Sequence, residues 1–175
     1  MAARDILQYP DPRLKQVCAA LTAFDSALGE LLQDLEDTMR AGAGSVGVAA
    51  PQIGACVRAA IVDLSGKPDV PQHGCLRLVN PEIVRREGEV MGREGCMSVP
   101  HYTGNVWRAA LIVVRAQDAR GEWHEWECHG FEARAVQHEI DHLDGLLFLD
   151  RVVSARHDLF RRKVYQPPRD PAVTV

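Results

Sequence analysis

The sequence lacks an excess of positive charge, long apolar segments and any run of basic residues. Its 175 residues carry a formal net charge of −4, so the electrostatic footprint of a nucleic-acid-binding protein is missing. The longest apolar runs, such as residues 109–114, are much too short to span a bilayer. Residues 1–15 contain acids and prolines in place of an apolar core, which predicts neither a secretory signal nor a transit peptide. We therefore expect a cytoplasmic protein, or one in the interior of an organelle, with no direct nucleic-acid or membrane partner.

The cysteines give no sign of a disulfide framework. There are five, an odd number, and they are scattered along the chain. Without a secretory signal, free thiols in a reducing compartment are expected. Apolar residues make up 46% of the chain, which is enough to fill one core of ordinary domain size. The composition indicates a single domain over residues 1–166 and a Pro-rich C-terminal tail over 167–175.

Hydrophobic periodicity predicts two helices. In the first, leucines recur at helical spacing between Asp25, which is suited to cap a helix, and Gly42, which is suited to end one. Helical spacing returns at residues 131–143, and Gly145 stands just beyond this second segment.

The segments between the two helices are typical of strands. Residues 57–65 form a short β-rich run, and residues 75–90 predict extended segments broken by Asn80-Pro81. Residues 109–128 predict a hairpin, because two β-rich runs flank a Gly-containing turn. A helix, mostly antiparallel strands and a second helix favour an α+β fold over an alternating parallel one.

The second predicted helix carries the pattern HExxH at His138, Glu139 and His142. Residues four apart lie on one helix face, so both imidazoles can bind one metal ion, while Glu139 lies about 100° around the helix, beside that ion. In this arrangement two histidines bind the metal and the glutamate handles protons.

Two simpler interpretations compete with a metal site. Surface histidines are disfavoured, because a helix with apolar residues on both sides is buried. Phe131 and Ala135 share the histidine side, and Val136, Ile140 and Leu143 lie opposite. A pair of core histidines satisfied by hydrogen bonds remains an alternative, since buried imidazoles need partners.

A catalytic metal usually has three protein ligands and one open position, so a third ligand is needed. No glutamate stands some twenty residues after His142, and no H-x-x-G-x-x-H extension follows it, as two classes of zinc protease require. Cys96, in the stretch 93–100, is a candidate because thiolates bind divalent metals strongly. The alternative for a single cysteine is a small buried apolar residue.

A third stretch, residues 44–54, is rich in glycine and alanine and contains Gln52. Small residues let a backbone approach another group closely, and Gln52 adds an amide donor. The alternative is an ordinary glycine-rich loop. A phosphate-binding loop is excluded, because no Gly-Lys-Ser/Thr follows.

Together the three stretches resemble the signature of the peptide deformylase family. That family is marked by G-x-G-x-A-A-x-Q, E-G-C-x-S and Q-H-E-x-D-H, which here read "SVGVAAPQ" (45–52), "EGCMS" (94–98) and "QHEIDH" (137–142) in the same order. The resemblance covers most of the chain, from "YPDPRL" at 9–14 to the "LDG" that follows the third motif.

The resemblance implies an α+β fold in which antiparallel β-sheets pack around a central HExxH helix, with an N-terminal helix. It implies a metal-dependent hydrolase that removes the N-formyl group from the N-terminal methionine of newly made polypeptides and releases formate. The substrate would be an N-formylmethionyl polypeptide, met as a nascent chain at the ribosome. The cofactor would be one divalent metal ion, natively Fe²⁺, with Zn²⁺, Ni²⁺ or Co²⁺ able to take its place.

The resemblance also implies roles for individual residues. The metal ligands would be Cys96, His138 and His142. Glu139 would be the general acid/base while water made reactive by the metal attacks the formyl carbonyl. Gln52 and the backbone N–H of Met97 would stabilise the oxyanion. Val46, Gly47 and Val48 would pair with the substrate backbone as an added strand.

Three positions depart from the family pattern. Ser45 replaces the first glycine of the first motif, and Thr103 stands where many bacterial members carry an arginine. Arg134 is expected in the substrate-binding region, where an apolar residue often lines the methionine pocket. A guanidinium there would narrow or polarise that pocket unless it found a partner.

Two other functions remain alternatives. A metallopeptidase would cleave ordinary amide bonds, but the context of Cys96 and the lack of a downstream glutamate argue against it. A catalytically silent metal-binding protein would need neither a base at Glu139 nor an oxyanion donor at Gln52.

Overall fold

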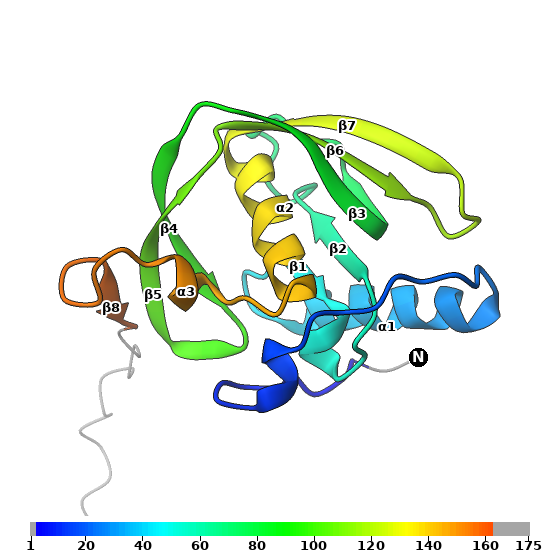
Figure 1. The fold of residues 1–175 in the computed structure, drawn as a ribbon, viewed down its shortest axis with the longest axis horizontal. Coiled ribbons are helices and arrows are strands. Elements are labelled where there is room, and N and C mark those ends of the chain that lie inside the picture. Colours follow the sequence, from blue (N-terminus) through cyan, green and yellow to red (C-terminus); the bar gives the residue numbers. More distant parts are fainter. Residues whose placement is uncertain (1–2, 163–175) are drawn as a thin grey trace, which may run out of the picture.

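The computed structural model describes residues 3–162, which form two antiparallel sheets arranged around one buried helix (Figure 1). The predicted tail at 167–175 and the domain limit at residue 166 lie outside the described residues, and both stay predictions. No helix in the described part of the chain has the length and apolar character needed to cross a membrane.

The larger sheet has five strands in the order β1-β2-β3-β6-β7. Their bounds are β1 Gly47–Ala49, β2 Ala59–Asp63, β3 Cys75–Glu87, β6 Leu111–Gln117 and β7 Trp123–His129. β6 and β7 form the predicted hairpin, paired from Leu111↔His129 to Gln117↔Trp123. β1 pairs with β2 alone, so its other edge is unpaired within residues 3–162.

The predicted break at Asn80-Pro81 is wrong, because β3 runs through it. The strand continues with a register shift between Val79 and Glu82, and Asn80 adopts a positive φ of 50°. The side chain of Asn80 replaces ladder hydrogen bonds: its amide donates to the carbonyl of Leu21 and accepts from the N–H of Leu21, both at 2.8 Å. The proline therefore lies in a β-bulge, where a missing N–H is tolerated.

The smaller sheet has the order β4-β5-β8, with bounds Val90–Cys96, Val99–Arg108 and Leu159–Arg161. β4 and β5 form a long hairpin whose register shifts between Gly95 and Cys96. Beyond this shift Cys96 pairs with Val99, so Cys96 lies at the tip of the hairpin, where its sulfur reaches His142 of the central helix.

The two main helices cover opposite faces of the larger sheet. Helix α1 (Ser26–Ala41) begins at Asp25, whose carboxylate accepts from the N–H groups of Ala27 and Leu28, and it ends at Gly42, as predicted. Helix α2 (Gly130–Leu143) follows β7 directly. Ile61 of β2 packs with α1, whereas its neighbour Val62 packs with α2, as the alternation of side chains along a strand requires.

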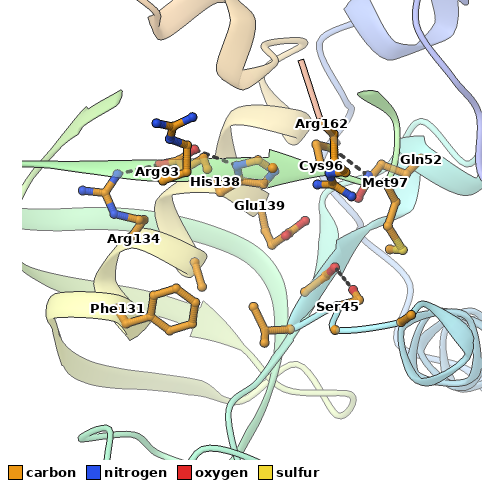
Figure 2. Close-up of a pocket in the computed structure, with 17 residues that line it drawn as sticks. Ser45, Gln52, Arg93, Cys96, Met97, Phe131, Arg134, His138, Glu139 and Arg162 are labelled. Carbon is orange, nitrogen blue, oxygen red and sulfur yellow. Dashed lines mark hydrogen bonds and ion pairs between the residues drawn. The ribbon is translucent and has the colours of Figure 1, made fainter. Parts of the chain in front are cut away.

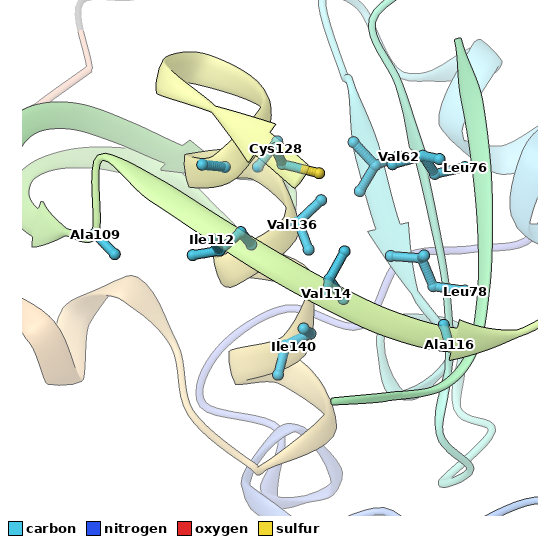
Figure 3. Close-up of a cluster of buried hydrophobic side chains, with 12 residues drawn as sticks. Val62, Leu76, Leu78, Ala109, Ile112, Val114, Ala116, Cys128, Val136 and Ile140 are labelled. Atoms are coloured by element: carbon cyan, nitrogen blue, oxygen red, sulfur yellow. The ribbon is translucent and has the colours of Figure 1, made fainter. Parts of the chain in front are cut away.

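Helix α2 is buried on almost all sides, as its doubly apolar pattern predicts. Val136 and Ile140 face the larger sheet and pack against Leu78, Ile112 and Val114 (Figure 3). On its other side lie the β4–β5 hairpin and the short helix α3 (Phe148–Arg151) (Figure 1). Two 3-10 turns, Pro12–Lys15 and Ala50–Ile53, complete the described elements. The predicted α+β fold with a central helix is confirmed.

Candidate metal centre

The three predicted metal ligands meet at one place. His138 and His142 lie one turn apart on α2, and Cys96 is the last residue of β4. Sγ of Cys96 lies 3.3 Å from Nε2 of His142, and a ligand atom from each of the three residues lies within 4.8 Å of the others. Soft thiolate and imidazole donors at this spacing suit a divalent transition metal.

A buried carboxylate orients one of the two imidazoles. Nδ1 of His138 donates to Oε2 of Glu94 at 2.8 Å, which leaves Nε2 to face the other ligands. Such a carboxylate–histidine pair fixes the tautomer and the ring orientation of a metal ligand. Nδ1 of His142 has no partner among residues 3–162, so this ring lacks the second hydrogen bond that orients His138.

Glu94 is also the centre of a buried ionic network. Arg108 donates to both of its carboxylate oxygens, at 2.9 and 3.0 Å, and Arg134 donates to Oε1 at 2.9 Å. Arg108 continues to Asp141 on α2. The network therefore joins β4, β5 and helix α2.

Glu94 was not among the predicted site residues, although the sequence carries a signal for it. Glu94 and Cys96 stand two apart on strand β4, so their side chains share one face. Gln137 was not predicted either; its amide donates to the carbonyl of Ala109 and accepts from its N–H. This pair fastens α2 to the end of the β4–β5 hairpin.

The electrostatics of the site favour a bound cation. Burial alone would raise the pKa of the Cys96 thiol, but His142 and His138 lower it well below its usual range. Burial would likewise lower the pKa of His138, whereas its hydrogen bonds to Cys96 and Glu94 raise it well above its usual value. The negative charges of Cys96 and Glu94 thus favour a proton on His138. A divalent cation would balance the same negative charges in place of that proton. The donor set therefore fits a metal ion.

Glu139 lies near His138 and Cys96, close to the backbone of β1 (Figure 2). A Cβ atom at Gly47 would stand only 2.5 Å from Oε1 of Glu139, so the glycine is what makes room for the carboxylate. Oε2 of Glu139 is buried and has no partner among the described residues. Burial raises the pKa of this carboxyl to about 7, although His138 and His142 lower it in part. A group with this pKa can both accept and donate a proton near neutral pH.

Gln52 is held with its amide nitrogen toward the cysteine. Its Oε1 accepts from the N–H of Ala49 at 2.9 Å, which turns Nε2 toward Sγ of Cys96 at 3.4 Å and Oγ of Ser98 at 3.1 Å. The side chain is buried. Met97 follows Cys96 in the turn between β4 and β5 and lies at the same cavity.

A cavity of about 250 Å³ opens in front of these groups. Val46 and Gly47 line it, whereas the side chain of Val48 is buried in the core beneath α1. The carbonyl of Val46 accepts from Asp63 on β2. Because bonding alternates along an antiparallel ladder, the polar groups of Gly47 point away from β2, toward the cavity.

The departures from the family pattern have local partners. Oγ of Ser45 donates to the carbonyl of Gly47 at 3.0 Å, and Oγ1 of Thr103 accepts from Arg93. Arg134 borders the cavity but donates to the carbonyls of Val90, Gly92 and Val106. Its guanidinium thus fastens the β4–β5 hairpin and already has its polar partners.

Comparison with known proteins identifies the family. The family model for polypeptide deformylase matches residues 3–158. The chain is 41% identical over 169 residues to a peptide deformylase of Acidobacterium capsulatum, covering 97% of this chain and 98% of that protein. It is 47% identical over 152 residues to one of Heliobacterium modesticaldum, covering 87% of this chain and 95% of that protein. A crystal structure of a peptide deformylase from Legionella pneumophila superposes with a TM-score of 0.80 at 41% identity, covering 86% of each chain. The chain therefore belongs to the peptide deformylase family, the metal-dependent hydrolases that remove the N-formyl group from newly made polypeptides.

Proposed function

We propose that Cys96, His138 and His142 hold the catalytic metal of this deformylase, and that Glu139 is its general acid/base. The observation that carries the proposal is the meeting of one thiol and two imidazoles at the tip of β4 and on α2, with a buried carboxylate beside them. A divalent cation bound by three protein ligands polarises a carbonyl and lowers the pKa of water.

Glu139 moves the proton in two directions. Its carboxylate takes a proton from the attacking water and later delivers it to the departing amine of methionine. A pKa near 7 supports both steps, since neither protonation state is strongly preferred at neutral pH. Gly47 keeps this carboxylate at the cavity wall, because any larger residue would collide with it.

Gln52 and the backbone N–H of Met97 stabilise the oxyanion that forms from the formyl oxygen. The hydrogen bond from Ala49 preorganises the Gln52 amide, so little reorganisation is needed when charge develops. One such donor contributes roughly 3–4 kcal/mol to the transition state.

The substrate binds along the unpaired edge of β1. Gly47 offers its backbone polar groups to the substrate chain, and Val46 lines the cavity beside it, while Val48 anchors the strand in the core. Arg134 stands at the cavity border and shapes it indirectly through the β4–β5 hairpin. The polypeptides would be N-formylmethionyl chains met at the ribosome, and we propose that the protein acts in the cytoplasm or in the interior of an organelle that makes its own proteins.

We assign Fe²⁺ as the native metal from the family resemblance alone. The set of one cysteine and two histidines also accepts Zn²⁺, Ni²⁺ or Co²⁺, and Fe²⁺ is not the tightest binder among them. Anaerobic purification followed by metal analysis tests the assignment: iron at about one equivalent supports it, and zinc in its place contradicts it.

Two substitutions test the division of roles. Glu139→Ala keeps about one equivalent of metal and loses at least ~10²-fold in formate release from formyl-Met-Ala-Ser, because general acid/base catalysis contributes about that much. Cys96→Ala loses the metal first, and activity falls with it. The exposed Glu125→Ala serves as the control and keeps both.

Equal metal loss in the Glu139 and Cys96 variants contradicts the assignment. Cleavage of the Met–Ala bond by the wild-type protein without formate release identifies a metallopeptidase instead. Metal-loaded protein that turns over neither bond identifies a silent metal-binding protein.

A further inference from the structure

Two thiols touch at a place remote from the metal ligands in sequence. Sγ of Cys18 lies 3.6 Å from Sγ of Cys56. Cys18 is buried, and Cys56 is partly exposed. Both are free thiols, and the deformylase reaction gives neither one a task.

The backbone holds the two cysteines side by side. The residues that follow them, Ala19 and Val57, form a parallel β-bridge. The N–H of Ala19 donates to the carbonyl of Cys56, and the N–H of Arg58 donates to the carbonyl of Ala19. Chains paired in this way lie about 4.7–4.9 Å apart, within the span of roughly 4.4–6.8 Å that a disulfide bridges between Cα atoms.

A third contact connects this pair to the metal-binding helix. The N–H of Cys18 donates to the carbonyl of Leu143 at 2.8 Å, one residue after His142. The side chains of Cys18 and Leu143 share a small apolar cluster with Ala49 and Ala60. The cysteine pair thus lies where the N-terminal segment, the larger sheet and the end of α2 meet.

We propose that Cys18 and Cys56 are a site of reversible oxidation, at which hydroperoxides form an intramolecular disulfide. In the first step the Cys56 sulfur attacks hydrogen peroxide, the O–O bond breaks, and a sulfenic acid and one water are produced. In the second step the Cys18 sulfur attacks the Cys56 sulfur, the S–OH bond breaks, and the departing hydroxide takes the thiol proton as a second water. The two thiols give up two electrons in total, and the peroxide takes them.

The order of the steps follows from access. Cys56 is the sulfur that solvent reaches, so it meets the peroxide first. Burial, together with the hydrogen bond between the two thiols, raises the pKa of Cys18 to about 12, which keeps it protonated and slow toward oxidants in solution. Contact with the Cys56 sulfur compensates for this weak nucleophile. An S–S bond of about 2.05 Å requires the two sulfurs to approach by about 1.5 Å.

The disulfide would close a loop that contains α1, strand β1 and Gln52. A loop of this length restricts the unfolded chain strongly, so the oxidised protein melts higher by roughly 5–10 °C. The bond leaves the metal ligands in place, and formate release stays within about twofold of the reduced protein.

The test uses zinc-loaded protein, since zinc takes no part in redox chemistry. Treatment with a small excess of hydrogen peroxide lowers the intact mass by about 2 Da, the loss of two hydrogens. Tryptic digestion then joins the peptides 16–40 and 41–58, each of which contains one cysteine. Dithiothreitol restores the original mass and melting temperature.

Variants make the result specific. Cys56→Ser abolishes both the cross-link and the rise in melting temperature, whereas the exposed Cys75→Ser retains both. Cys18→Ser leaves Cys56 without its partner, so a sulfenic acid accumulates there and reacts with dimedone. The proposal is overturned if the wild-type peptide 41–58 gains oxygen without a cross-link, or if the cross-link survives in Cys56→Ser.

Discussion

Replacement of Gly47 by alanine tests whether the position of the Glu139 carboxylate sets the rate. The added Cβ atom would lie 2.5 Å from Oε1 of Glu139 and 2.9 Å from its Cδ. Ordinary contact begins at about 3.4 Å, so the carboxylate must retreat by about 1 Å, because the strand that carries Gly47 is fixed by its pairing with β2. The φ of Gly47 is not positive, so alanine brings no backbone strain of its own.

A displacement of this size slows proton transfer strongly. Misplacing a catalytic group by about 1 Å costs on the order of 10²-fold in rate, which is about 2.7 kcal/mol in the activation free energy. We expect kcat for formate release from formyl-Met-Ala-Ser to fall by about that factor. Metal content stays at about one equivalent, because the three atoms nearest the added methyl group all belong to Glu139 and none belongs to a proposed ligand.

The control is Gly29→Ala on helix α1, where the added methyl group meets no atom within 4 Å. This variant keeps kcat and gains up to ~1 kcal/mol in the free energy of unfolding, the usual difference between glycine and alanine inside a helix. If Gly47→Ala keeps kcat within about threefold of the wild type, the position of Glu139 does not limit the reaction. If KM rises while kcat is unchanged, the added methyl group obstructs the substrate and not Glu139, and this result refutes the same reasoning.

Three further substitutions probe the surroundings of the site. Burial would raise the pKa of Glu94, but His138 holds it well below its usual value of 4.5, so its charge contributes stability that is present above pH 4.5 and is lost as the pH falls. In Glu94→Gln, the urea midpoint of the metal-free protein therefore depends less on pH below 4.5. The affinity of the same variant for metal at pH 7, measured by chelator competition, falls by about 10–100-fold. In Ser45→Ala the Gly47 carbonyl loses its internal donor, and KM falls by up to about fivefold while kcat is unchanged; an unchanged KM means that this carbonyl does not bind substrate. Arg134→Met lowers the free energy of unfolding by about 2–4 kcal/mol in urea titration because backbone carbonyls lose their donor, and a loss below about 1 kcal/mol contradicts that role.

Rules that involve only neighbouring residues were enough to predict the two main helices and two of the three proposed metal ligands. Helical spacing and the residues Asp25 and Gly42 gave the bounds of α1 closely, because capping is a property of neighbouring residues. The same periodicity placed His138 and His142 on one face of α2. The thiol made Cys96 a candidate third ligand, but its assignment beside the two histidines came from the resemblance, since no spacing rule connects residues more than forty positions apart.

The features that could not be predicted from the sequence depend on contacts between segments that are distant along the chain. Asn80-Pro81 predicted a break between extended segments, but Asn80 is held at this point of β3 by bonds to Leu21, Arg58 and Gln117, which come from remote parts of the chain. The contact between Arg108 and Asp141 depends in the same way on how the hairpin packs against α2. Glu94 was within reach, because alternation along β4 places it on the face of Cys96.

The sharing of Glu94 between a histidine and two arginines has a thermodynamic consequence. The carboxylate that orients His138 also holds the β4–β5 hairpin, so occupancy of the metal site and closure of the hairpin are reciprocally linked: each strengthens the other by the same factor. Amide hydrogens of β4 and β5 therefore exchange with deuterium more slowly in the loaded protein, while those of β2 and β6 barely change. Release of the ion would then allow the smaller sheet to open locally, whereas the amides of the five-stranded sheet would stay protected from hydrogen exchange.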